Sequence, residues 1–239
     1  MSPSRQERFY AALVHLLTAS GALFGFLALL SAARGAFEES FIWLGVAFIV
    51  DGLDGPLARR FEVARVLPRF SGEDLDQIID YLTYVTVPAF MLASSGLLPS
   101  GLEVAAAGIV MLVSLYHFAD RDSKTGDGYF VGFPAIWNVV VLYLFVVPVA
   151  KEAALAIVLG CAVLTFVPLK WVHPVRVRRI RWLTALLTVA WAIAAVTAVL
   201  TRFPGPRAVQ AVFLIVLAYG IGVGLWAGMA RKAPGKGAE

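Results

Sequence analysis

Long apolar runs, separated by short connections, dominate the hydrophobic pattern of the chain. A helix needs roughly 20 consecutive apolar residues to cross a bilayer, and this length gives eight candidate segments. They cover residues 10–33, 40–61, 73–95, 101–119, 131–149, 152–171, 180–200 and 208–230. Pro99, Pro148 and Pro204 fall between or near the ends of these segments, where helices are expected to stop. The pattern predicts an all-α integral membrane protein with about eight transmembrane helices.

The composition supports this class, because 60% of the residues are hydrophobic and only 15% are charged. A soluble domain carries about a quarter charged residues, so an ordinary soluble globular fold is excluded. No soluble domain or internal repeat interrupts the apolar segments, and residues 1–239 are therefore expected to form one polytopic membrane domain. The single cysteine, Cys161, excludes an intramolecular disulfide.

The Lys and Arg residues gather in alternate connections between the predicted helices. They cluster at both termini and in the connections 59–72, 120–130 and 170–181, whereas the opposite side holds only Arg34, Lys151, Arg202 and Arg207. Since cytoplasmic loops of membrane proteins carry an excess of Lys and Arg, both termini are expected in the cytoplasm. Such loops also favour anionic lipid head groups, so the net charge of +4 requires no nucleic-acid partner.

Four aspartates stand inside the second and third apolar segments. Asp51 and Asp54 are spaced i, i+3, and Asp76 and Asp80 are spaced i, i+4, so each pair occupies one face of its predicted helix. At about 1.5 Å rise per residue, all four lie at a similar depth below the cytoplasmic ends of the two helices. Two consecutive antiparallel helices are therefore expected to direct four carboxylates at a shared point.

Four ionised carboxylates in so small a volume would repel one another and would be poorly solvated. Divalent cations, more plausibly two than one, remove this conflict, and carboxylate oxygens suit Mg²⁺ or Mn²⁺. A site with two metal ions is typical of phosphoryl chemistry. The alternative is that the aspartates form salt bridges at the helix ends with Arg59, Arg60 or Arg69.

Small residues accompany the acids in the same stretch. Gly55 and Ala58 leave room beside Asp54 for a bulky ligand, and Gly72 does the same across the connection, although small residues also serve close helix packing in membranes. Arg59 is well placed to meet a phosphate. The stretch thus combines candidate metal ligands with a candidate phosphate site.

These positions together resemble the signature of the CDP-alcohol phosphotransferases. The matching residues are Asp51, Asp54, Gly55, Ala58, Arg59, Gly72, Asp76 and Asp80. The chain departs from the family in one respect, because residues 60–71 form a longer spacer than the family usually has. This spacer is expected to form a longer cytoplasmic loop.

The resemblance implies transfer of a phosphatidyl group from CDP-diacylglycerol to an alcohol, with release of CMP. It implies that Asp51, Asp54, Asp76 and Asp80 bind Mn²⁺ or Mg²⁺ and that Asp80 is also the general base. Gly55, Ala58, Arg59 and Gly72 would hold the CDP moiety. The expected location is the bacterial inner membrane with the active site facing the cytoplasm, and a homodimer is one expected assembly.

The acceptor alcohol is expected to bind near residues 116–138. This segment, the longer spacer and the eight-helix count resemble the bacterial members that use choline. Choline is a permanent cation, which aromatic faces and a nearby carboxylate can hold. The candidates are Tyr84, Tyr116, Asp120, Asp122, Phe130 and Trp137.

Two alternatives remain at this stage. A sister enzyme would use serine, glycerol phosphate or inositol phosphate, and the loop arginines could serve a phosphorylated acceptor. An ion-coupled transporter would also carry intramembrane carboxylates, but it would spread them over several helices near the bilayer midplane. Here the acids gather at one end of two adjacent helices, which favours the enzyme.

Overall fold

The computed structural model describes residues 3–120, 130–167, 170–171 and 181–230. The elements in chain order are α1 (Arg5–Ala33), α2 (Phe37–Arg60), α3 (Val63–Val66), α4 (Gly72–Asp80), the π-helix η1 (Tyr81–Thr86), α5 (Val87–Ser94), α6 (Glu103–Ala119), β1 (Phe130–Val131), α7 (Trp137–Val146), α8 (Lys151–Leu164), β2 (Lys170–Trp171), α9 (Arg181–Leu200) and α10 (Arg207–Ala230). The two short strands form an antiparallel pair. Every longer element of the described residues is helical, which confirms the predicted all-α class.

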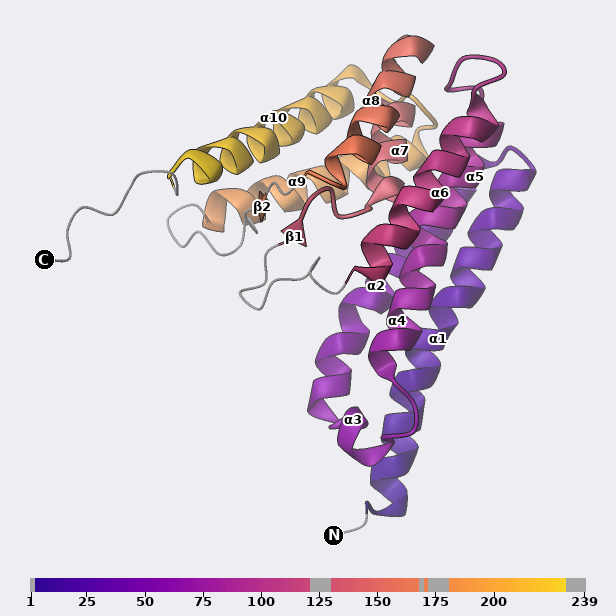
Figure 1. The fold of residues 1–239 in the computed structure, drawn as a ribbon, viewed down its shortest axis with the longest axis vertical. Coiled ribbons are helices and arrows are strands. Elements are labelled where there is room, and N and C mark those ends of the chain that lie inside the picture. Colours follow the sequence, from indigo (N-terminus) through magenta and orange to yellow (C-terminus); the bar gives the residue numbers. More distant parts are fainter. Residues whose placement is uncertain (1–2, 121–129, 168–169, 172–180, 231–239) are drawn as a thin grey trace, which may run out of the picture.

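The helices α1 and α2 form an antiparallel hairpin along the long axis of the molecule (Figure 1). A capping box starts α1: the backbone N–H of Glu7 donates to the Ser4 hydroxyl, and the Ser4 N–H donates to the Glu7 carboxylate. Arg65 on α3 pairs with Glu7 and with Glu62, so the connection after α2 is tied back to the start of α1.

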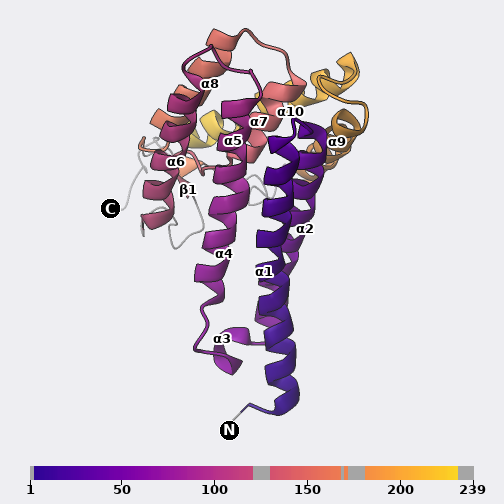
Figure 2. The ribbon, with the colours of Figure 1, turned by 90° about the vertical axis from the view of Figure 1, so that its right-hand side faces the viewer.

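The helix α4, the π-helix η1 and α5 follow one another without a break from Gly72 to Ser94. This composite helix matches the predicted segment 73–95, and it lies between α6 and the α1–α2 hairpin (Figures 1 and 2). Gly21 on α1 permits the close approach of α4, because a Cβ at this position would lie 2.6 Å from Cγ2 of Ile79. The small residue on α1 therefore brings the acidic face of α4 against the hairpin.

The predicted segment 131–149 is helical only over α7, from Trp137 to Val146. Ten residues make a helix about 15 Å long, roughly half the hydrocarbon thickness. The preceding residues instead dock on the end of α8: the Phe133 N–H donates to the Leu164 carbonyl, and Gly132 has a φ of +81°. The predicted segment was long enough to cross a bilayer, but the residues before Trp137 form this bend and are not part of the helix.

The remaining predicted segments each contain a helix, and the outer surface of the molecule is apolar. Among the described residues, three helices are long and apolar enough to cross a membrane, namely Arg5–Ala33, Phe37–Arg60 and Trp182–Leu200. Large apolar side chains such as Leu16, Phe48 and Val104 are more than half exposed. Exposed apolar surface of this extent is characteristic of an integral membrane protein.

The helices α9 and α10 run across the direction of the α1–α2 hairpin at the end opposite the N-terminus (Figure 1). They pack on α7 and α2 through the main hydrophobic core, which includes Ala194, Ala198 and Phe213. The Tyr143 hydroxyl of α7 donates to the Phe213 carbonyl over 3.2 Å. The first part of α1, the end of α2, α3 and α4 lie at the opposite end of the molecule from α9 and α10 (Figure 1).

Candidate active site

Three carboxylates from two helices meet in the structure. Asp51 comes from α2, and Asp76 and Asp80 come from α4; one oxygen atom of each lies within 4.8 Å of the others. All three side chains are half-buried. The i, i+4 spacing places Asp76 and Asp80 on one face of α4, and α2 brings Asp51 to the same point. The sequence pattern predicted this convergence.

Asp54 lies beside this group of three without belonging to it. Its side chain is buried, and it lines the same small cavity as Asp51, Asp76 and Asp80. A step of three residues turns a helix by about 300°, so Asp54 is displaced from Asp51 around α2 as well as along it. The expectation that all four carboxylates share one point therefore holds for three of them.

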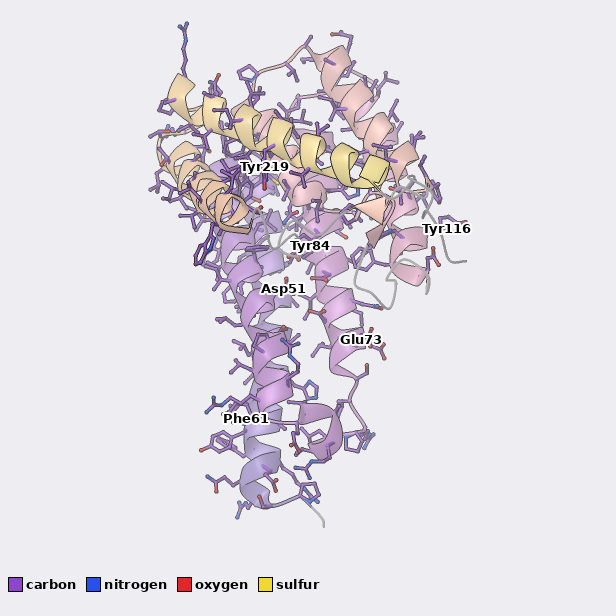
Figure 3. The ribbon with its side chains drawn as sticks, turned by 90° about the vertical axis from the view of Figure 1, so that its left-hand side faces the viewer. Asp51, Phe61, Glu73, Tyr84, Tyr116 and Tyr219 are labelled. Carbon is purple, nitrogen blue, oxygen red and sulfur yellow. The ribbon has the colours of Figure 1, made fainter. Side chains whose placement is uncertain are left out.

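Tyr84 contacts the acidic cluster directly. Its hydroxyl donates to Oδ2 of Asp51 over 2.9 Å, as the two labelled side chains in Figure 3 indicate. Tyr84 belongs to η1, which follows Asp80 without a break and ends with the backbone bond from the Val87 N–H to the Leu82 carbonyl. Isolated π-helical turns inside α-helices occur frequently at functional sites.

The donor set suits a hard divalent cation. Oxygen ligands on Mg²⁺ lie 2.0–2.1 Å from the ion, so opposite ligands are about 4.2 Å apart, which is close to the 4.8 Å limit observed here. Ionised carboxylates only accept hydrogen bonds, and a divalent cation offsets the mutual repulsion of three of them in one place. Asp51, Asp76 and Asp80 therefore fit a divalent metal ion.

The predicted nucleotide-binding residues lie further along α2 and at the start of α4. Arg59 folds back over Gly55, since a Cβ on Gly55 would lie 3.5 Å from Nη1 of Arg59. Gly72 is exposed at the first residue of α4, next to the ring of His15 on α1. Ala58 packs on a small apolar cluster that contains Val63 and Val66, so it supports the loop after α2.

The predicted acceptor residues fall into different environments. Tyr116 and Asp120 line one cavity at the end of α6, together with Phe166, and among the described residues none lines both this cavity and the cavity of the aspartates. Trp137 is fully buried and donates its ring N–H to the Ser114 hydroxyl over 2.8 Å, as a core residue does. The backbone of Phe130 forms β1, and Asp122 lies outside the described residues. The contacts of these side chains with choline stay predictions.

Comparison with models of known protein families finds no match. Comparison with curated proteins finds the phosphatidylcholine synthase of Rhizobium johnstonii, 42% identical over 206 residues that cover 86% of this chain and 85% of that protein. The phosphatidylcholine synthase of Pseudomonas aeruginosa is 40% identical over 226 residues, 95% of this chain and 94% of that protein. The chain belongs to the phosphatidylcholine synthase family. The phosphatidylcholine synthase of Agrobacterium fabrum agrees, with 44% identity over 81% of this chain and 80% of that protein.

Membership in the phosphatidylcholine synthase family confirms the resemblance that the aspartate pattern carried. The structure adds residues that sequence reasoning missed for this family member. Thr18 and Gly21 of α1 and Thr83 of η1 line the cavity of the aspartates. His15 of α1, whose ring lies beside Gly72, was also not among the predicted site residues. Its Nε2 atom is buried and has no hydrogen-bond partner among the described residues. A signal existed for α1, since Thr18 and Gly21 recur at helical spacing after His15.

Proposed function

We propose that the protein transfers the phosphatidyl group of CDP-diacylglycerol to choline, which yields phosphatidylcholine and CMP. The observation that carries the proposal is the convergence of Asp51, Asp76 and Asp80 in a chain of the phosphatidylcholine synthase family. The names of the related proteins support choline as the acceptor. The reaction takes place at the cytoplasmic face of the bacterial inner membrane.

The four aspartates hold Mn²⁺ or Mg²⁺, with two ions as the expected number. Asp51, Asp76 and Asp80 provide the central ligands, and Asp54 lines the same cavity. When bound, such ions act as Lewis acids on the diphosphate oxygens and stabilise the CMP leaving group. The carboxylates of the chain orient the ions toward the substrate.

Asp80 also takes the proton from the choline hydroxyl. The oxygen of choline attacks the phosphorus that carries the diacylglycerol, and the bond from this phosphorus to the bridging diphosphate oxygen breaks as CMP leaves. A carboxylate within hydrogen-bond reach of the attacking hydroxyl is a suitable general base. Asp80 is half-buried beside Asp76, so it is close to the reacting groups without being sealed from them.

The nucleotide half of CDP-diacylglycerol lies toward the cytoplasmic end of α2. The Arg59 guanidinium above Gly55 is positioned to donate hydrogen bonds to a phosphate, which guanidinium groups bind well. Gly55 and the exposed Gly72 leave space for the substrate beside the backbone, and Ala58 supports the loop below them. These residues hold the CDP moiety while the diacylglycerol chains remain in the bilayer.

Residues of the segment 116–138 bind choline. Tyr116 and Asp120 combine an aromatic face with a carboxylate around one cavity, which is the chemistry that holds a quaternary ammonium group. This cavity, at the cytoplasmic end of α6, is the proposed entry site for choline. Tyr84, Phe130, Trp137 and Asp122 are the further choline candidates.

The acceptor assignment is tested with purified protein in lipid nanodiscs, supplied with Mn²⁺, CDP-diacylglycerol and labelled acceptor. Choline is expected to give labelled phosphatidylcholine, and serine, glycerol phosphate and inositol phosphate are expected to give no lipid product. Asp76→Asn protein serves as the inactive control. A product with one of the other alcohols and none with choline would reject choline while leaving the reaction class intact.

A further inference from the structure

We propose that Tyr84 is a positioning residue that orients Asp51 and thereby sets the affinity of the aspartate cluster for divalent metal. The proposal rests on the metal site of the proposed function. The signature residues end at Asp80. Tyr84 lies four residues, about one helical turn, beyond it. Its role follows from its hydrogen bond with Asp51 and from the turn that carries it.

The first step concerns the orientation of Asp51. The Tyr84 hydroxyl donates to Oδ2 of Asp51 over 2.9 Å, and this bond restricts rotation of the carboxylate. Asp51 is the only member of the group of three that comes from α2, so its orientation decides whether the ligands of α2 and α4 face the same ion. Groups that hold metal ligands by hydrogen bonds tune metal affinity, and their loss typically weakens binding about 10- to 100-fold.

The second step concerns how Tyr84 itself is held. Its ring packs against the main hydrophobic core, in which neighbouring Val85 is fully buried. Tyr84 follows Asp80 by four residues, as Asp80 follows Asp76, and it lies within the π-helical turn of η1 that continues α4. The phenol is therefore fixed to the same rigid composite helix that carries two of the metal ligands, and the Asp51 carboxylate is held relative to them.

Tyr81 supplies a matched control from the same π-helix. Its hydroxyl donates over 2.9 Å to the Met111 carbonyl of α6, so Tyr81→Phe removes a hydrogen bond of equal length between η1 and another helix. The acceptor is a backbone carbonyl for Tyr81 and the Asp51 carboxylate for Tyr84, and this is the difference that the comparison isolates. A purely structural role of the phenols would make the two variants behave alike.

The test measures Mn²⁺ binding by electron paramagnetic resonance of free Mn²⁺, with wild-type, Tyr84→Phe and Tyr81→Phe proteins in nanodiscs. Tyr84→Phe is expected to raise the Mn²⁺ dissociation constant about tenfold, and Tyr81→Phe is expected to leave it within about twofold of wild type. Thermal unfolding in chelator is expected to be similar for both variants, which shows that the difference is not one of folding.

Three results would overturn the proposal. Mn²⁺ binding by Tyr84→Phe as tight as that of wild type, or equal weakening in both variants, would reject the positioning role and leave the proposed function standing. If the wild-type protein itself binds no Mn²⁺, the metal site of the proposed function fails, and the role of Tyr84 fails with it.

Discussion

Replacement of Asp80 by asparagine is expected to lower the rate of phosphatidylcholine formation by about three orders of magnitude or more. The substitution keeps the size of the side chain but removes the proton acceptor, which alone contributes about 10²- to 10⁴-fold. It also removes one of the three converging metal ligands. The measurement is the initial rate of labelled choline incorporation at saturating Mn²⁺ and CDP-diacylglycerol.

Glu73→Gln is the matched control for Asp80→Asn. Glu73 is an exposed acid in the first turn of the same helix, and Figure 3 shows it on the outer side of α4, away from Asp51. Neutralising it is expected to leave the rate within about twofold of wild type, since surface substitutions usually have small effects. If Asp80→Asn kept more than a tenth of the wild-type rate, Asp80 would not be the general base.

Removal of divalent metal is expected to abolish the transfer completely and reversibly. Without a cation, the carboxylates of Asp51, Asp76 and Asp80 repel one another, and the diphosphate loses the charge neutralisation that the metal would supply. Treatment with EDTA followed by its removal is expected to give inactive protein, and added Mn²⁺ or Mg²⁺ is expected to restore activity. The measurement is the initial rate before chelation, after it and after each metal is returned.

Thermal unfolding provides an independent readout of the same site. A ligand at a hundred times its dissociation constant stabilises the folded state by about 2.7 kcal/mol, so Mn²⁺ is expected to raise the Tm of the wild-type protein. The Asp76→Asn variant, which loses a ligand of the cluster, is expected to show little of this increase. Full activity in excess chelator would contradict the metal requirement.

The convergence of the aspartates was predictable because it depends on helix periodicity and on the antiparallel course of two apolar segments that follow one another in the sequence. The spacing of Asp76 and Asp80 keeps both on one face, and α2 is bound to run antiparallel to α4 beside them. The position of Asp54 was not predictable to the same degree. The i, i+3 step displaces it around α2, and only the packing of α1 decides that its side chain is buried.

The contact between Tyr84 and Asp51 could not be predicted from the sequence, because it depends on the π-helical turn of η1. The apolar segment 73–95, which contains two tyrosines, is typical of an ordinary α-helix with interfacial aromatic residues, and its sequence does not indicate the π-helical turn of η1. Trp137 illustrates the opposite case: an aromatic residue near the expected acceptor segment lies in the core, where Ser114 satisfies its ring N–H. Composition and spacing alone do not distinguish these two environments.

The number of membrane crossings was the least predictable feature. Hydrophobic length identified a helix in every predicted segment, but it did not reveal that residues 132–136 bend onto α8 and shorten α7. Positive φ angles at Gly132 and Ala135 mark this bend. Such a bend is stabilised by contacts between distant parts of the chain, whereas hydropathy reports only local composition.

The most direct measurement is anomalous X-ray diffraction at the manganese edge from crystals of the protein grown with Mn²⁺. An anomalous peak bounded by the carboxylates of Asp51, Asp76 and Asp80 is expected, with all three at bonding distance from the ion and Asp54 beside it. Fully occupied manganese elsewhere in the molecule, with these three carboxylates pointing apart, would show that the aspartates do not form the metal centre and would remove the basis of the proposed chemistry.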